Sequence, residues 1–83
     1  MKDWWVYILE CRDGTFYTGI TDDIQSRLVV HNEGKGARYT KGRGPVLLRY
    51  SEKVQGRGEA TRREVEIKKM NRSEKMRLMG ILR

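Results

Sequence analysis

The sequence contains very few cysteine, proline, histidine and phenylalanine residues. Its 83 residues include one cysteine, one proline, one histidine and one phenylalanine. Because Cys11 has no second cysteine to pair with, an intrachain disulfide and a closed zinc site built from several Cys and His ligands are both excluded. We expect Cys11 to be packed inside the protein, as free cysteines commonly are. This cysteine usage agrees with a reducing compartment.

Long hydrophobic runs are also missing. The longest uncharged apolar stretch is Trp4 to Leu9, whereas a helix that spans a membrane needs about 20 apolar residues. The N-terminus has no basic region leading into a signal-type apolar core. We therefore expect a cytoplasmic protein with no membrane partner. A chain this short cannot fill a second core, so residues 1–83 are expected to form a single domain.

Positive charge exceeds negative charge and is clustered. Eighteen Lys and Arg against eleven Asp and Glu give a formal charge of +7. The stretch between Gly34 and Arg49 contains no acid and holds Lys35, Arg38, Lys41, Arg43 and Arg49. A second basic stretch runs from Lys68 to Arg83, with Glu74 as its one acid. Such clusters favour a nucleic acid as partner. A lipid surface is the competing polyanion, but residues 70–82 make only a mediocre amphipathic helix for it.

Two short apolar runs at the N-terminus predict a β-hairpin. Trp4 to Leu9 is rich in aromatic and branched residues and predicts a strand buried on both faces. Thr15 to Ile20 has a similar composition, and the Asp13-Gly14 pair between the runs favours a tight turn. Register is not fixed by this pattern, because a slip of one residue reverses every side chain. Whether Tyr7 and Tyr17 share a face therefore stays open at this stage.

A helix is predicted after the hairpin. Thr21, Asp22 and Asp23 supply an N-cap and negative charge for the first turn, and the helix is expected to run to about Asn32, with Gly34 ending it. Arg27 and His31 are four residues apart, which places them one above the other on one helix face.

The glycine-rich segment from Gly34 to Gly44 predicts a mobile loop. It matches neither phosphate-binding glycine motif and precedes a strand rather than a helix. Its side chains instead fit contacts with a nucleic-acid backbone and base stacking, and the candidate nucleic-acid-binding residues are Lys35, Arg38, Tyr39, Lys41 and Arg43, with Lys68 further along the chain.

The remainder of the chain predicts a third strand and two helices. Val46 to Tyr50 reads as the strand, and Ser51 to Gly58 as a polar link. Helical spacing then runs from Ala60 to Met70. Ser73 is the expected cap of a final helix, and its apolar positions are Met76, Met79 and Leu82.

The order of five features along this chain points to a family. The tripeptides Trp5-Val6-Tyr7 and Tyr17-Thr18-Gly19 are followed by Arg27, His31 and Glu64. From Trp4 to Met70 the chain resembles the GIY-YIG nuclease family, and within it the short bacterial members that consist of this domain alone. The tripeptides here read WVY and YTG. The resemblance implies an α/β fold in which helices flank a small, mainly antiparallel three-stranded sheet.

The same resemblance implies a divalent-metal-dependent endonuclease that hydrolyses phosphodiester bonds in DNA, with Mg²⁺ or Mn²⁺ and no small-molecule cofactor. It assigns Glu64 to the metal, Arg27 to the charge of the transition state, and His31 to proton transfer. Tyr7 is implied as general base or water-orienting group, and Tyr17 as its partner at the phosphate. Catalytic residues are thus expected to be Tyr7, Tyr17, Arg27, His31 and Glu64, meeting in one cleft.

Residue chemistry is compatible with these roles. Arginine presents a planar fork of donors to phosphate oxygens, histidine titrates near neutral pH, and Mg²⁺ commonly takes only one or two carboxylates and keeps several waters. A phenol with a pKa near 10 is a poor base unless nearby cations favour phenolate. Gly19 is expected to allow the close approach of substrate or of a neighbouring helix.

Each residue also has an ordinary structural explanation. Glu64 could simply pair with Lys68 four residues on. Arg27 could be a surface arginine beside Asp23, and His31 a structural residue with satisfied ring nitrogens. Both tyrosines could be strand aromatics that pack the sheet.

The sequence departs from the family pattern at two positions, and the second departure, a missing amide, favours an alternative function. Trp5 replaces the first glycine, and Met76 occupies the position where many family nucleases have an asparagine; the nearest amide is Asn71. The alternative is a catalytically weak or inactive nucleic-acid-binding module of the same fold. A third possibility is an adaptor that binds a protein through the basic C-terminal helix. The sequence does not decide whether the substrate is DNA or RNA, or whether repair intermediates are preferred over other substrate structures. It does not decide the oligomeric state either.

Overall fold

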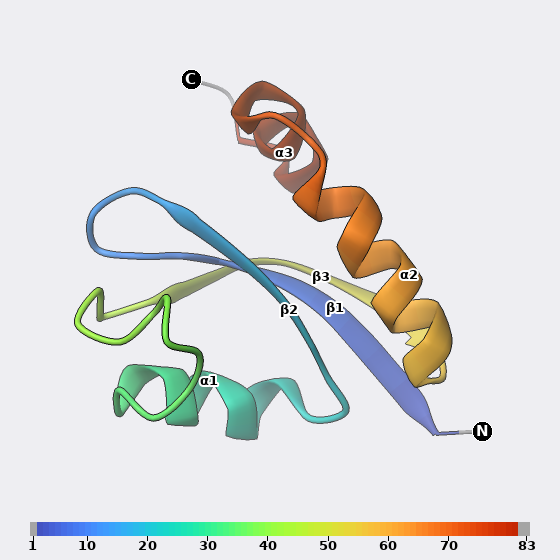
Figure 1. Ribbon diagram of the computed structural model, residues 1–83, viewed down its shortest axis with the longest axis horizontal. Coiled ribbons are helices and arrows are strands. Elements are labelled where there is room, and N and C mark those ends of the chain that lie inside the picture. The colour runs from blue at the N-terminus through green and yellow to red at the C-terminus, as the bar shows by residue number, and fades with distance from the viewer. Residues whose placement is uncertain (1, 82–83) are drawn as a thin grey trace.

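The computed structural model describes residues 2–81 and contains one sheet with helices on both of its faces (Figure 1). Its elements in chain order are β1 (Asp3–Glu10), β2 (Phe16–Thr21), α1 (Ile24–Asn32), β3 (Leu47–Gln55), α2 (Arg57–Lys68) and α3 (Arg72–Met79). The three strands are antiparallel, in the order β2-β1-β3. The predicted fold class is confirmed. No helix among residues 2–81 is long and apolar enough to cross a membrane.

The central strand β1 separates two hydrophobic cores. Its residues Val6 to Leu9 are all buried, as the apolar run predicts, and they alternate between the two faces of the sheet. Val6 and Ile8 pack with Val54 and with Ala60 and Ile67 of α2. On the other face, where α1 lies, the core consists of Tyr7, Leu9, Cys11 and Val46, with Ile24 and Leu28 of α1 packed against it. The expected burial of Cys11 is confirmed.

The register of the hairpin places both site tyrosines on the α1 face. Tyr7 pairs with Gly19, and Leu9 pairs with Tyr17. Since side chains directly opposite each other in a sheet project to the same face, as do residues two apart on one strand, Tyr7 and Tyr17 lie diagonally on one face.

The third strand is longer than predicted. It extends from Leu47 to Gln55, so the residues from Ser51 to Gln55, which were expected to belong to a link, pair with β1 instead. Ser51 lies opposite Tyr7, and Gln55 opposite Asp3. The prediction was wrong because β3 is an edge strand with much of its surface in solvent, and such a strand needs little apolar sequence.

The N-cap of α1 lies within the predicted segment, whereas the N-cap of α3 differs from expectation. Asp23 is the N-cap of α1 and accepts a hydrogen bond from the Ser26 backbone N–H, whereas Asp22 pairs with Lys2 at 2.7 Å. In α3 the cap is Asn71 rather than Ser73, which lies within the first turn. The Asn71 side chain accepts from the Glu74 N–H, and the Glu74 carboxylate accepts from the Asn71 N–H, so two donors are satisfied at once.

Replacing Asn71 tests this cap. Asn71→Ala should lower the free energy of unfolding by about 1 kcal/mol, because a helix N–H loses its acceptor. Ser73→Ala is the matched control and should change it by less than about 0.5 kcal/mol. Chemical denaturation of the two variants measures the difference, and an equal loss in both would contradict the assignment of the cap.

Candidate active site

A hydrogen bond inside the α1-side core joins the first tripeptide to the helix. The hydroxyl of Tyr7 on β1 lies 2.9 Å from Nε2 of His31 on α1. Both side chains are almost fully buried, with 2% and 1% of their surfaces exposed. Their rings meet edge to face, with centroids 5.9 Å apart. The family resemblance implied a shared site, and the structure brings these two residues into direct contact.

The second ring nitrogen of His31 contacts the glycine-rich loop. Nδ1 lies 2.8 Å from the hydroxyl of Thr40, and that hydroxyl donates to the carbonyl of Ala37 at 3.0 Å. Thr40 is 1% exposed. Sequence reasoning missed Thr40, because a threonine in a polar loop has no periodicity to mark it as buried. The loop is therefore anchored in the core at this point.

Two glycines leave the space that these polar groups occupy. A Cβ at Gly19 would lie 2.6 Å from the Tyr7 hydroxyl, and a Cβ at Gly36 would lie 2.3 Å from Nδ1 of His31. Both distances are far shorter than a carbon contact allows. Gly19 therefore makes room for Tyr7, not for the substrate or helix that the sequence predicted. Gly36 was not singled out from the sequence, since it is one of several glycines in its loop.

Tyr17 extends the aromatic cluster toward the loop. Its ring centroid lies 6.4 Å from that of Tyr7 and 5.3 Å from that of His31. Tyr39 stacks on it at 6.1 Å, and the guanidinium of Arg43 lies 4.4 Å from the centroid of Tyr39. The Tyr17 hydroxyl makes no hydrogen bond to any residue within 2–81.

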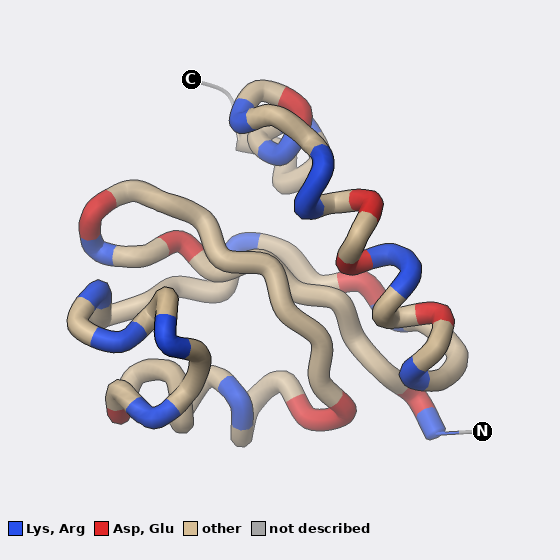
Figure 2. Tube along the Cα trace, in the orientation of Figure 1, with Lys and Arg blue, Asp and Glu red and all other residues tan. Residues whose placement is uncertain are grey.

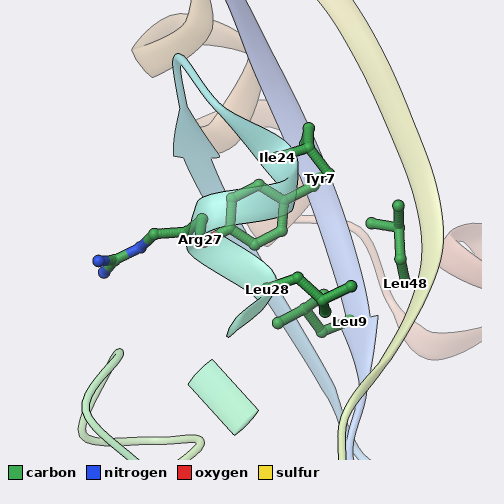
Figure 3. Close-up of a pocket in the computed structure, with 6 residues that line it drawn as sticks. All are labelled: Tyr7, Leu9, Ile24, Arg27, Leu28 and Leu48. Carbon is green, nitrogen blue, oxygen red and sulfur yellow. The ribbon is translucent and has the colours of Figure 1, made fainter. Parts of the chain in front are cut away.

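Arg27 lies beside this cluster, one turn before His31 on α1. Together with Tyr7 it borders a hollow whose other lining residues are Leu9, Ile24, Leu28 and Leu48. The hollow is too narrow to admit a water molecule, so it is a gap in the packing and not a substrate pocket. Figure 3 shows the Arg27 guanidinium extending away from the aliphatic side chains. Arg27 makes no ion pair with a described residue. The carboxylate of Asp23, which could have paired with it, caps the N-terminus of α1.

The electrostatics of the site keep both members of the buried pair neutral near pH 7. Burial raises the pKa of Tyr7 to about 12. A hydrogen bond between Arg27 and the Tyr7 hydroxyl, and the positive charge of Arg27, lower this pKa but do not outweigh burial. Burial also lowers the pKa of His31, and the nearby charge of Arg27 lowers it further. The arginine alone therefore does not make Tyr7 a phenolate, and a proton acceptor is needed.

Glu64 lies on α2, which packs against β2 and β1 on the face of the sheet opposite to α1. Its negative charge contributes to the raised pKa of Tyr7, so it acts on the phenol electrostatically. Within residues 2–81 it makes no hydrogen bond to the other four candidates. Its carboxylate pairs with Lys68 at 3.3 Å, the ordinary contact that the spacing also predicted.

The donor set is compatible with one hard divalent cation. No group of three or more His, Cys, Asp and Glu side chains gathers anywhere in the described part of the chain. Glu64 is the one carboxylate among the five candidate residues, and its side chain is 19% exposed. A cation such as Mg²⁺, which keeps several waters, fits one accessible carboxylate.

Met76, at the position where the resemblance implies an asparagine in many nucleases, has no amide group. Asn71, the nearest amide, is used in the cap of α3.

Lys and Arg residues are spread along the glycine-rich loop on one side of the sheet and along α2 and α3 on the other side (Figure 2). Lys35, Arg38 and Lys41 are exposed and form no ion pair with another described residue. Arg43 differs, because it pairs with Asp13 in addition to lying over Tyr39. Among the predicted contact residues, the first three are therefore the ones with unpaired positive charge in this loop.

Comparisons with known proteins agree with this architecture. Residues 3–77 match the GIY-YIG catalytic domain. A UPF0213 protein of Halobacterium salinarum is 53% identical over 70 residues, which are 84% of this chain and 91% of the relative. A UPF0213 protein of Staphylococcus haemolyticus is 46% identical over 95% of this chain and 96% of its own length.

Solved structures show the same fold. The solution NMR structure of a UPF0213 protein from Bacillus halodurans has 45% identity and a TM-score of 0.61, and the match covers 94% of this chain and 83% of that one. A protein from E. faecalis, also solved by NMR, has 38% identity and a TM-score of 0.62 over 94% and 84% of the two chains.

Adding one methyl group at Gly19 tests the packing around Tyr7. Gly19→Ala should lower the free energy of unfolding by about 1 to 3 kcal/mol, because the new carbon overlaps a buried hydroxyl that is held by its hydrogen bond to His31. Gly58→Ala on α2 is the control, because a Cβ at Gly58 would have no atom within 4 Å. This substitution should leave the free energy of unfolding unchanged or raise it by up to about 1 kcal/mol. Thermal or urea unfolding measures both, and a fully stable Gly19→Ala would refute the close contact.

The lowered pKa of His31 predicts a pH effect on stability. Below its ordinary pKa of 6.5 the unfolded chain binds a proton at His31 that the folded chain does not, so stability falls as pH is lowered from about 7 toward 5. The slope should reach at most about 1.4 kcal/mol per pH unit. His31→Gln, which removes the only imidazole, should have a much flatter profile in that range. Equal slopes in denaturation measured at several pH values would contradict this.

Proposed function

Because this chain belongs to the GIY-YIG family and to its UPF0213 group, we propose that it is a divalent-metal-dependent endonuclease that hydrolyses phosphodiester bonds in DNA. The observation that carries the proposal is the buried hydrogen bond between Tyr7 and His31, with Tyr17 and Arg27 beside it. Phosphodiester hydrolysis needs a proton acceptor for water and donors for the phosphate charge, and these four residues supply both.

Tyr7 and His31 form the proton-accepting unit. As water attacks phosphorus, one of its protons moves to the Tyr7 oxygen while the phenolic proton moves to Nε2 of His31, which lies 2.9 Å away. A phenol with a raised pKa can act in this way because no free phenolate forms. The imidazolium that results has two N–H donors, directed at Tyr7 and Thr40.

Arg27 and Tyr17 are the groups that bind the phosphate. The guanidinium is permanently charged and extends clear of the apolar packing (Figure 3), so it can donate to two phosphate oxygens. The Tyr17 hydroxyl, which has no partner among the described residues, can donate to a third oxygen. The hydrogen bonds from both donors strengthen as negative charge develops on the phosphate oxygens in the transition state.

Glu64 is the residue that would hold the divalent cation, Mg²⁺ or Mn²⁺, which supplies positive charge for the phosphoryl oxygens and the leaving group. Binding of that cation competes with Lys68 for the carboxylate. Lys68 is then free to contact the nucleic-acid backbone.

The exposed cations of the loop position the substrate. Lys35, Arg38 and Lys41 are suited to phosphate contacts, which fix the position of a nucleic acid without reading its sequence. Structure-dependent or unspecific cleavage follows from such contacts. Tyr39 is already stacked on Tyr17 and covered by Arg43, so a base that stacks on it competes with the arginine.

A cleavage assay with matched variants tests the proposal. Purified protein with Mg²⁺ or Mn²⁺ should cleave at least one of a set of single-stranded, duplex and branched DNA and RNA substrates. Glu64→Gln and Arg27→Ala should each reduce the rate by about 100-fold or more, the usual effect of removing a charge-stabilising group. Glu66→Gln and Arg62→Ala, two exposed residues of α2, are the controls and should retain activity. Equal activity in all five proteins would show that the cleavage comes from another site or from a contaminant.

A second candidate function is nucleic-acid binding without turnover. The observation that favours it is the missing amide, since Met76 has none and Asn71 is used in a helix cap. This candidate predicts that affinity falls steeply with salt, that combined neutralisation of Lys35, Arg38 and Lys41 weakens binding, and that no metal supports cleavage.

A further inference from the structure

We infer that Thr40 is a positioning residue that holds His31 in the tautomer with its proton on Nδ1, which leaves Nε2 free to receive the proton of Tyr7. The inference rests on the proposed function for its catalytic consequence only. The tautomer itself is a property of the folded protein and can be measured without any substrate.

The proton count at Thr40 carries the first step. The hydroxyl has a single proton, and its oxygen lies 3.0 Å from the Ala37 carbonyl and 2.8 Å from Nδ1 of His31. A carbonyl oxygen can only accept, and the Thr40 hydroxyl has the geometry to donate to Ala37, so the hydroxyl proton is assigned to that contact. The remaining contact, between the Thr40 oxygen and Nδ1, then requires the proton to be on the imidazole. Nε2 is left unprotonated and accepts from the Tyr7 hydroxyl.

A competing donor lies near the same nitrogen. The backbone N–H of Ala37 is 3.5 Å from Nδ1 and would favour the opposite tautomer. This contact is at the limit of a hydrogen bond, whereas the Thr40 contact at 2.8 Å is short, so Thr40 decides the position of the proton.

The backbone around Thr40 holds its hydroxyl in place. The Thr40 N–H donates to the same Ala37 carbonyl at 3.1 Å, and the Thr40 carbonyl accepts from Arg43 at 3.0 Å. Gly36 lets the loop cross directly over the imidazole, where any side chain would collide with Nδ1. The same tight turn exposes Arg38 and Lys41 to solvent, so the residues suited to phosphate contacts and the residue that orients His31 belong to one backbone segment.

NMR of the imidazole nitrogens tests the inference directly. His31 is the only histidine, so its ¹⁵N signals are assigned without selective labelling. The wild-type protein above the pKa of His31 should show a protonated Nδ1 and an unprotonated Nε2. Thr40→Val keeps the shape and removes the hydroxyl, so Nδ1 should become the acceptor for Ala37 N–H and the proton should move to Nε2. Thr40→Ser keeps the hydroxyl and should keep the wild-type pattern.

Two results would overturn the positioning role. One is an Nε2-protonated imidazole in the wild type, which decides the question even when Thr40→Val does not fold. The other is a folded Thr40→Val whose tautomer equals that of the wild type.

Cleavage kinetics test the catalytic consequence separately. Thr40→Val should slow single-turnover cleavage by about 10- to 100-fold, the range found when a partner that orients an imidazole is lost, with a Kd for DNA within about threefold of wild type. Thr40→Ser should restore the rate. A Thr40→Val protein with an altered tautomer and a normal rate would overturn the catalytic consequence. A wild-type protein that never cleaves would refute the proposed function and leave the tautomer measurement decisive for Thr40.

Discussion

The hydrogen bond between Tyr7 and His31 is the interaction around which the α1 side of the molecule is organised. Two polar groups on different elements are buried there, and burial without a partner would be costly for each. The bond therefore fixes the distance of α1 from the central strand. Through Thr40 it also ties the glycine-rich loop to the same core, so sheet, helix and loop share one polar network. Every described buried side-chain N or O atom in a residue that is not exposed has a partner.

Much of the fold was predictable from local patterns. The continuous apolar run of β1 identified a central strand, because only a strand covered on both faces lacks alternation. The Asp13-Gly14 turn predicted the hairpin, and the ordered motif residues identified the family. The length of the third strand was underestimated, because the residues from Ser51 to Gln55 are mostly polar and lie on an edge strand of the sheet. Ser73 and Asn71 are both good caps, and only the Glu74 reciprocal bond separates them.

The arrangement of the candidate site was less predictable. Whether the two tyrosines face each other depends on register, which the tertiary packing of two cores fixes and no short sequence pattern encodes. The role of Thr40 depends on a loop folding back over an imidazole, and the need for Gly36 follows from the same crossing. Tyr7 is neutral near pH 7 because burial raises its pKa by more than the hydrogen bond and charge of Arg27 lower it.

The division of the interior by β1 has a consequence for how this protein can change. Four of the five candidate catalytic residues lie on the α1 side, and Glu64 alone comes from the helix on the other side. Small shifts of α2 relative to the sheet, caused by substitutions at residues such as Ile67 or Val54, would therefore move Glu64 relative to the other four candidates. Substitutions in the core on the α2 side are therefore a route by which related chains can change the position of Glu64 without changing Tyr7, Tyr17, Arg27 or His31.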